Sequence, residues 1–236
     1  MAANVLVMGG LGQVGSALAQ VLSKKNSVYI LDLNEGPGLI KDLDFLHVCI
    51  PYTENFVGIV YDVIEKYKPK YTVIHSTVPV GTTRQIGGNV CHSPVRGQHN
   101  DLKGSLLKFS KYMGSVNRRT AEAVKRHLED SRVKVVVCSK PEETELTKLL
   151  CLSRYLNDLA FYEAASSLYK RFRVNRNVMK HWTQTYNEGY KGTKWVRPEL
   201  DFPNGKVGGH CVIPVSKMLV EQTEDEWFDR NLELFR

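Results

Sequence analysis

The sequence has no long hydrophobic run. No segment reaches the ~20 consecutive apolar residues that a membrane-spanning helix needs, so no membrane partner is expected. The first predicted strand begins as early as Asn4, which predicts that no secretory signal peptide precedes it. Hydrophobic residues make up 42% of the chain and charged residues 24%, an ordinary balance that excludes disordered and fibrous classes. These features predict a cytoplasmic globular protein.

Cysteines are few and scattered, and none belongs to a C-x-x-C pair. Their number is odd, which excludes a complete disulfide framework and favours reduced thiols; no metal site is expected either. His47 lies near Cys49, and Cys91 is next to His92, but these are interpreted as strand residues and not as ligands. The five cysteines are Cys49, Cys91, Cys138, Cys151 and Cys211.

Positive charge exceeds negative charge by a formal +7, from 32 Lys and Arg residues against 25 Asp and Glu residues. Such a surface attracts nucleic acid, and equally an anionic small molecule such as a nucleotide sugar. The basic residues are spread along the chain. Their densest group, within residues 170–176, has no aromatic-rich β platform around it, so nucleic-acid binding is not favoured.

Residues 4–23 predict a strand, a glycine turn and a helix. Gly10, Gly12 and Gly15 fit the G-x-G-x-x-G spacing of a dinucleotide-binding turn. The first glycine permits a tight turn, the second permits backbone N–H groups to approach a pyrophosphate, and the third permits close helix packing. The turn and the helix start, with Gln13 and Val14, are expected to bind the cofactor, because a helix N-terminus attracts phosphate.

A second apolar run, Val28–Leu31, ends in Asp32. An acidic residue at this strand end is placed to accept a hydrogen bond from the ribose 2′-OH, which favours NAD over NADP. Pro51 ends the next apolar run, residues 45–50, at the corresponding position and is included in the predicted cofactor site. The alternative is a glycine-rich turn in an α/β protein that has lost its ligand.

The order of elements predicts the α/β class: a Rossmann-type, mostly parallel sheet with helices on both faces. Residues 1–139 are expected to form an NAD-binding domain, and residues 140–236 a helical region for substrate binding or dimerisation. Further strands are predicted at residues 71–75, 89–92, 112–116 and 133–137, and helices at 56–67, 118–129, 177–186 and 221–236.

A long central helix is predicted to open the second region. Ser139 and Glu142 have the spacing of a capping box, and Pro141 suits a first helical turn. The apolar periodicity continues to Phe172 with an offset, so that two faces of the helix are apolar. The length and the two faces indicate a core helix and suit the interface of a homodimer.

Four sequence islands together resemble the UDP-glucose/GDP-mannose dehydrogenase family, which oxidises nucleotide sugars. The Gly-Gly-His-Cys form is closest to the UDP-N-acetylmannosamine branch. The resemblance covers that family's first Rossmann domain and central helical region, without the C-terminal domain that binds the sugar nucleotide. The islands are Gly10–Gly15 with Asp32, the loop Ser76–Thr83, Glu145-Leu146-Thr147-Lys148, and Gly208-Gly209-His210-Cys211.

The resemblance implies an enzyme that passes hydride twice to NAD and turns an alcohol into an acid through a cysteine-bound thiohemiacetal. Cys211 would be the nucleophile, and Lys148 would polarise the reacting oxygen or take its proton. Thr77 would lie beside the nicotinamide and the substrate. The substrate, expected to be a nucleotide sugar, would be bound by Arg96, Gly209 and His210.

The sequence departs from the family pattern at three polar positions. Val95 stands where the family has a glutamate, Leu152 where it has an asparagine, and residues 214–216 where it has an aspartate. Two alternatives therefore stay open. One is a module that binds NAD without catalysis, and the other is a one-step β-hydroxyacid or sugar-alcohol dehydrogenase with Lys148 as base.

Overall fold

The computed structural model describes residues 2–33, 35–97, 99–199 and 212–233. The chain forms two compact units, Met1–Lys148 and Leu149–Arg236. The first contains a sheet with helices, and the described part of the second is helical. The division falls inside one long helix, and the domain boundary expected after residue 139 stays a prediction.

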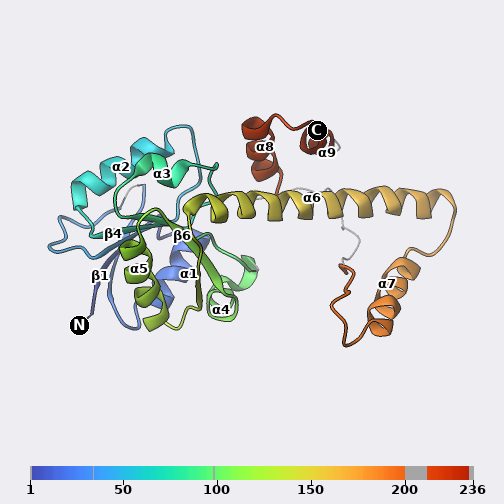
Figure 1. The fold of residues 1–236 in the computed structure, drawn as a ribbon, viewed down its shortest axis with the longest axis horizontal. Helices are drawn as coiled ribbons and strands as arrows, with labels where there is room; N and C mark the ends of the chain where they lie inside the picture. Colours follow the sequence, from blue (N-terminus) through green and yellow to red (C-terminus); the bar gives the residue numbers. More distant parts are fainter. Residues whose placement is uncertain (1, 34, 98, 200–211, 234–236) are drawn as a thin grey trace. The chain divides into compact units, whose positions relative to one another are not determined.

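A seven-stranded sheet forms the centre of the first unit (Figure 1). The strands lie in the order β2-β1-β3-β4-β5-β6-β7, and every neighbouring pair is parallel except β5 and β6. The predicted fold class is therefore confirmed. The strands are β1 Asn4–Met8, β2 Ser27–Leu31, β3 Phe45–Val48, β4 Tyr71–Ile74, β5 Val90–His92, β6 Lys111–Ser115 and β7 Val135–Val137.

The sheet changes winding direction at β1. The chain passes from β1 to β2 on one side and then returns to place β3 on the other side of β1. In open parallel sheets the connections diverge at such a point and leave a crevice at the carboxyl ends of the strands. The topology therefore singles out the ends of β1 and β3.

One face of the sheet is covered by α1 (Gln13–Leu22), α4 (Leu102–Lys108) and α5 (Arg118–Asp130). Because strand side chains alternate, every second residue of β1 points to this face, and Val5 and Val7 are fully buried there. The helices contribute buried leucines, valines and alanines at the same core. Each fully buried leucine or valine side chain stabilises the fold by about 1.5–3 kcal/mol relative to an exposed one.

The opposite face is covered by α2 (Phe56–Tyr67) and α3 (Thr82–Ile86), above the sheet in Figure 1. The alternate residues of the same strands, Leu6 among them, pack here against Phe56 and Val60. A shift of one residue in any strand would exchange the two faces, so the apolar pattern fixes the register.

The helix α4 was not predicted. It forms because Asp101 caps it, with a carboxylate oxygen that accepts the Gly104 N–H at 2.9 Å. The last strand is also shorter than predicted, beginning at Val135 and not at Val133. Val133 instead packs into the core around α5, where its N–H donates to the carbonyl of Leu128.

The long helix α6 spans Pro141–Arg171 and matches the predicted extent closely. Its cap differs from the prediction. Glu143 and not Glu142 pairs with Ser139, accepting from the serine N–H at 2.9 Å and the hydroxyl at 2.6 Å. With Pro141 as the first helical residue, Glu143 is the third, which is the position that reaches back in a capping box.

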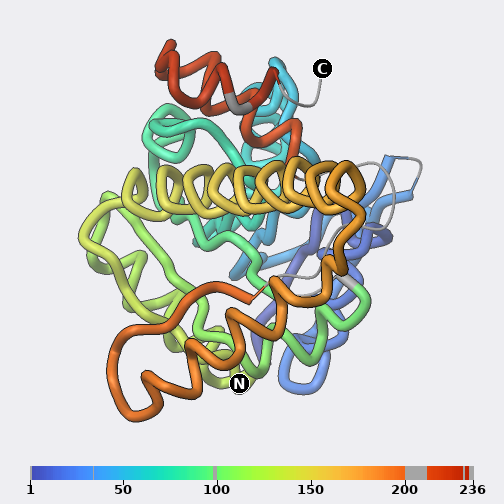
Figure 2. Tube along the Cα trace, turned by 90° about the vertical axis from the view of Figure 1, so that its right-hand side faces the viewer, coloured from blue at the N-terminus to red at the C-terminus, as the bar shows by residue number. Residues whose placement is uncertain are grey.

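Three more helices belong to the second unit: α7 (Asn177–Gly189), α8 (Val212–Thr223) and α9 (Glu226–Glu233). The helices α8 and α9, red in Figure 2, contact each other, and Val212 and Leu232 pack with Leu156 of α6. No helix in the described ranges combines the length and apolar character needed to cross a membrane.

Candidate functional site

The carboxyl ends of five parallel strands share one edge of the sheet. Asp32 follows β2, the glycine turn follows β1, Pro51 comes shortly after β3, and Thr77 shortly after β4. Arg96 lies on the segment that leaves β5. Strand pairing thus brings together predicted site residues that are distant in sequence, in the order of the strands.

The glycine turn is built on a residue that the sequence reasoning missed. Gly9 has φ +75°, the left-handed region, and its N–H donates to the Leu31 carbonyl at 2.8 Å. Gly10, to which the tight turn was assigned, does not have a positive φ. The Gly9-Gly10 doublet directly after an apolar run was the signal for this position.

The other glycines are required by close approach. A Cβ at Gly15 would lie 2.1 Å from the Gly9 carbonyl oxygen, and one at Gly10 would lie 2.6 Å from the Ile30 side chain. Gly12 is the N-cap of α1, and a Cβ there would meet the Gly9 oxygen at 3.3 Å. The result is a turn in which Leu11 alone carries a side chain, at a helix N-terminus that begins with Gln13 and Val14, the surroundings that a phosphate group requires.

Asp32 lies against this turn. One carboxylate oxygen accepts the Leu11 N–H at 2.9 Å, and the other accepts the Leu33 N–H at 2.9 Å. The main chain of Asp32 also pairs with Glu35 in an isolated antiparallel bridge. These bonds hold a carboxylate beside the glycine turn, where the ribose of a dinucleotide bound there would lie. The residues present therefore fit a nicotinamide dinucleotide.

The loop that contains Thr77 is fixed at both ends. The Ser76 hydroxyl donates to the Ile50 carbonyl at 2.5 Å, beside Pro51. At the other end, Glu145 of α6 accepts hydrogen bonds from Gly81 and Thr83. Thr77 itself is half-buried between these anchors.

Lys148 points toward the segment that follows β5. Its ammonium donates to the Val95 carbonyl at 2.9 Å. The neighbouring carbonyls of Ser93 and Pro94 accept hydrogen bonds from Lys111, at 3.1 Å for Pro94. Two lysines from different elements thus hold three successive carbonyls.

Lys111 was not predicted as a site residue. It is only 3% exposed on β6, and burial lowers its pKa to about 7. In the sequence, Lys111 stands between a serine and a tyrosine and belongs to no motif, so nothing there marked it as a site residue. The amine is therefore poised between its charged and neutral forms at neutral pH.

A chain of three buried histidines runs beneath this segment. His75 Nδ1 lies 2.9 Å from the Ser93 carbonyl, which can only accept, so Nδ1 carries the proton. His75 Nε2 then accepts from His47 Nδ1 at 2.8 Å, and His47 Nε2 accepts from His127 Nε2 at 3.1 Å. The bonds run in one direction with every ring neutral, consistent with burial that lowers the pKa of each.

His92 is a separate buried histidine on β5. Its Nε2 lies 3.0 Å from the Ser76 carbonyl, and its Nδ1 lies 2.8 Å from the Thr144 hydroxyl of α6. Burial lowers its pKa to about 3. His47 and His92 were interpreted as strand residues, and both lie in strands. Among the described residues no group of three or more His, Cys, Asp or Glu side chains is arranged to hold a metal ion.

The remaining predicted residues divide into two groups. Arg96 is exposed, donates to the Ser110 carbonyl at 3.4 Å and lies over the Tyr112 ring at 5.4 Å. Gly209, His210 and Cys211 lie outside the described residues. The structure therefore leaves the predicted nucleophile and two predicted substrate residues untested.

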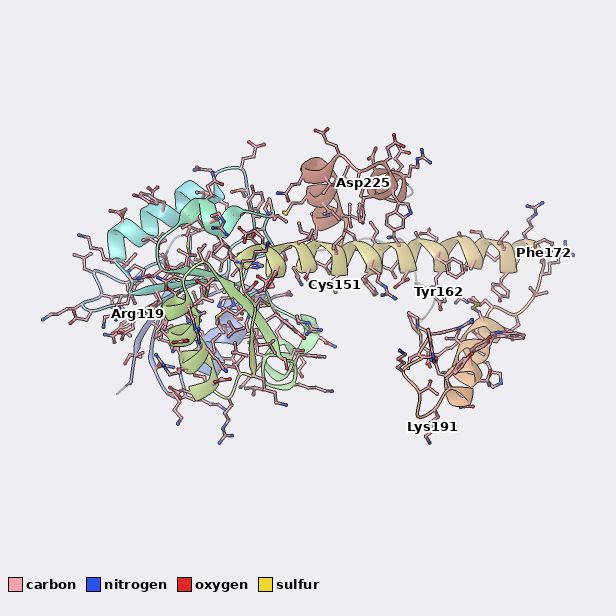
Figure 3. All side chains as sticks on the ribbon, in the orientation of Figure 1. Arg119, Cys151, Tyr162, Phe172, Lys191 and Asp225 are labelled. Carbon is pink, nitrogen blue, oxygen red and sulfur yellow. The ribbon has the colours of Figure 1, made fainter. Side chains whose placement is uncertain are left out.

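The four described cysteines are free thiols. Burial raises the pKa of Cys49 and of Cys91 to about 12, so neither forms a thiolate at neutral pH. Cys151 is exposed on α6 (Figure 3). Cys138 is half-buried, and its pKa is raised by burial and by the Glu143 charge.

Several solved structures are similar to this fold. UDP-D-ManNAc dehydrogenase from Pyrococcus horikoshii matches 98% of this chain and 68% of its own, with a TM-score of 0.82 and 16% identity. The chain shares its fold with this dehydrogenase. UDP-glucose dehydrogenase from Pyrobaculum islandicum matches 99% of this chain and 67% of its own, with a TM-score of 0.73 and 16% identity.

A shorter protein also shares this fold. Mycobacterium tuberculosis 3-hydroxyisobutyrate dehydrogenase matches 100% of this chain and 93% of its own, with a TM-score of 0.74 and 15% identity. No protein-family model and no curated protein matches the sequence. The resemblance expected from the sequence islands is confirmed for the fold.

Proposed function

We propose that this protein is an NAD-dependent oxidoreductase that acts on an alcohol group of a nucleotide sugar. One observation carries the proposal: Asp32, the glycine turn, the Thr77 loop and Lys148 are all anchored along the carboxyl edge of the sheet, on both sides of its switch point. A cofactor bound across that edge would place its phosphates on α1 and its nicotinamide toward β4.

The preference for NAD comes from Asp32. Its carboxylate is held beside the turn by the Leu11 N–H, with oxygen lone pairs available to a ribose hydroxyl. A 2′-phosphate at the same place would meet a like charge, which disfavours NADP. When bound, the cofactor supplies a hydride acceptor, and the chain must supply the groups that orient the alcohol and take its proton.

Lys148 is proposed to orient the alcohol oxygen and, in its neutral amine form, to take that proton. Its side-chain nitrogen donates a hydrogen bond to the Val95 carbonyl at 2.9 Å, in the segment that follows β5. Val95 stands where the family has a carboxylate, so a backbone carbonyl orients the lysine in this chain. Thr77 is proposed to contact the nicotinamide and the substrate, and Arg96, Gly209 and His210 to bind the substrate.

Cys211 is proposed as the nucleophile of a second oxidation. Loss of a hydride and a proton converts the alcohol into an aldehyde. The Cys211 thiolate then adds to the aldehyde carbon, and loss of a second hydride from the thiohemiacetal leaves a thioester. Water displaces the thiolate and releases the acid, so that two hydrides leave for each alcohol oxidised.

A one-step dehydrogenase is the second candidate. The chain matches 93% of 3-hydroxyisobutyrate dehydrogenase but only 68% of the UDP-D-ManNAc dehydrogenase. This reading assigns Lys148 as the base and gives Cys211 no chemical role. It also predicts a small hydroxyacid or sugar alcohol as substrate, with one hydride transferred.

NADH formation, followed at 340 nm, tests both candidates with UDP-sugars, GDP-sugars and β-hydroxyacids as substrates. The Cys211→Ala variant should lose more than about 10²-fold in NADH formation under the two-step proposal, because no covalent intermediate can form. Under the one-step proposal it should keep its activity, and Lys148→Met should lose it. Cys151→Ala and Lys170→Met are matched controls on exposed positions of α6.

The outcomes separate the candidates. NADH formation that survives Cys211→Ala would overturn the thiohemiacetal step. Measurable NAD binding without turnover on any substrate would instead support a module that has kept its cofactor and lost catalysis.

A further inference from the structure

Glu145 is a fully buried carboxylate that the proposed chemistry does not use. Its side chain is 0% exposed. One oxygen accepts the Gly81 N–H at 2.7 Å, and the other accepts the Thr83 N–H at 2.8 Å and the Thr83 hydroxyl at 2.6 Å. A buried charge persists only where donors satisfy it, and here three donors come from one loop.

These bonds occupy the first backbone donors of α3. The N–H groups of Gly81 and Thr83 point at Glu145 and are therefore closed to a cofactor phosphate. Gly81 has φ +96°. The bonds from Gly81 and Thr83 to Glu145, here called the Glu145 clamp, keep this conformation in place. The loop is thus anchored from inside the protein and leaves phosphate binding to α1.

The turn of α6 that carries Glu145 also contacts the segment that follows β5. Residues three apart on a helix share a face, so Glu145 and Lys148 project from neighbouring positions. Lys148 binds the Val95 carbonyl, and Thr144 binds His92, whose other ring nitrogen binds the Ser76 carbonyl. One helical turn therefore holds both ends of the Thr77 loop and the segment after β5.

We propose that Glu145 is a positioning residue that fixes the Thr77 loop relative to Lys148. The inference rests on the proposed function, because it gives Thr77 and Lys148 their roles at the reacting carbon. Glu145 touches neither substrate nor cofactor; it sets the distance between groups that do. A displacement of about 1 Å at such a site lowers the rate by about 10²-fold.

Glu145→Gln is the sharpest test. Glutamine keeps the length of the side chain, but its NH₂ group must face either the Gly81 N–H or the Thr83 donors, so one contact becomes donor against donor. Glu142→Gln is the matched control, because Glu142 also joins α6 to α3, through Arg84 at 2.6 Å, but at the surface.

The first readout is independent of activity. Hydrogen exchange at the amides of Gly81 and Thr83 should be at least about tenfold faster in Glu145→Gln, because their acceptor is impaired. Exchange in residues 9–15 should stay unchanged, and Glu142→Gln should match the wild type in both segments. Wild-type exchange rates at Gly81 and Thr83 in Glu145→Gln would overturn the clamp.

The second readout separates positioning from stability. In Glu145→Gln, kcat should fall about 10- to 100-fold, while the Kd for ADP-ribose, which the proposed function places at the glycine turn, stays within about twofold. Equal losses in kcat and ADP-ribose affinity would mean general destabilisation and would overturn the positioning role. If Glu145→Gln does not fold, Thr83→Ala removes one donor, and Thr83→Ser should restore the wild-type values.

Failure of the proposed function has a different signature. A wild-type protein that binds neither NAD nor ADP-ribose would overturn the proposed function and the positioning role together. The clamp would still be decided by the exchange rates at Gly81 and Thr83.

Discussion

At the scale of the residue, Gly15 shows how little space the turn leaves. A Cβ at this position would lie 2.1 Å from the Gly9 oxygen and 2.8 Å from the Gly10 Cα, both backbone atoms that cannot rotate away. We expect Gly15→Ala to displace the turn and to weaken NAD binding by more than about tenfold. Gly38→Ala is the control, because its Cβ would meet nothing within 4 Å. Calorimetric titration of both variants measures the effect, and equal affinities would contradict the geometry.

Asp32 gives a second prediction at this scale. Asp32→Ala removes the carboxylate beside the turn, and a charged hydrogen bond contributes about 1.5–3 kcal/mol, so NAD affinity should fall at least about tenfold. NADP affinity should fall less or rise, because the repelling charge is gone. Glu35→Ala is the control at a neighbouring exposed side chain. Unchanged NAD affinity in Asp32→Ala would mean that the ribose lies elsewhere.

Sequence reasoning reached the residues that carry a local signal. Gly10, Gly12 and Gly15 have a fixed spacing, and Asp32 ends an apolar run. The contacts of Lys111 and Glu145 carry none, because they join positions 17–64 residues apart in the chain. Such pairings depend on how the strands are ordered, and a local pattern does not contain that order.

At the scale of the element, the chain of His47, His75 and His127 makes the sheet sensitive to acid. Burial lowers the pKa of His127 to about 4 and those of His47 and His75 well below their ordinary value. The charges of Lys111 and His92 disfavour a protonated His75 ring, whereas the charges of Asp130 and Asp44 favour a protonated His127 ring. A proton added to His75 or His47 would also turn an acceptor of the chain into a donor that faces a donor.

The sign of the pH dependence follows from these shifts. The unfolded histidines take up protons below about pH 6.5 and the folded ones do not, so the free energy of unfolding decreases as pH falls from 6.5 toward 4. His127 alone accounts for about 3 kcal/mol of this loss. Urea unfolding at pH 7.5 and 4.5 measures it. His127→Gln should reduce the loss, and the exposed His181→Gln should not; an unchanged midpoint between the two pH values would contradict the neutral chain.

Element prediction succeeded where periodicity is strong and failed where a single cap decides. The apolar run of β1 and the helical repeat of α2 fixed their type and nearly their bounds. By contrast, α4 depends on the Asp101 cap, and the start of α6 depends on which glutamate reaches Ser139. The capping-box spacing from Ser139 selects Glu142, but Pro141 is the first helical residue, so Glu143 is the third and reaches back to Ser139.

At the scale of the whole molecule, apolar side chains of α6 remain uncovered. Its apolar residues are distributed around the helix, a pattern typical of helices that are buried on several sides. We therefore propose a homodimer formed through α6, as expected from the sequence. The exposed large side chains on this helix are Leu146, Leu150, Tyr155, Phe161 and Leu168.

Phe161, 57% exposed, offers the test of that dimer. Phe161→Glu places a charge in the proposed interface and should shift the protein to a monomer at micromolar concentration, because a buried unpaired charge is costly. Light scattering coupled to gel filtration measures the mass. Glu163→Lys is the control for a charge change nearby on the same helix. A monomeric wild-type protein would contradict the proposed interface.

The sheet order reported above also determines how the first unit avoids pairing with other sheets. The outermost strands are β2 and β7, and an outer strand offers unpaired N–H and C=O groups to any other chain. The strand β7 consists of three valines, two of them more than 40% exposed, and exposed β-branched residues on an edge strand favour aggregation. Two features protect β7 against pairing with another chain: it is only three residues long, and the basic residues Arg132 and Lys134 precede it. Lengthening β7 or neutralising Lys134 would therefore promote fibrous association of this protein even if the fold were unchanged.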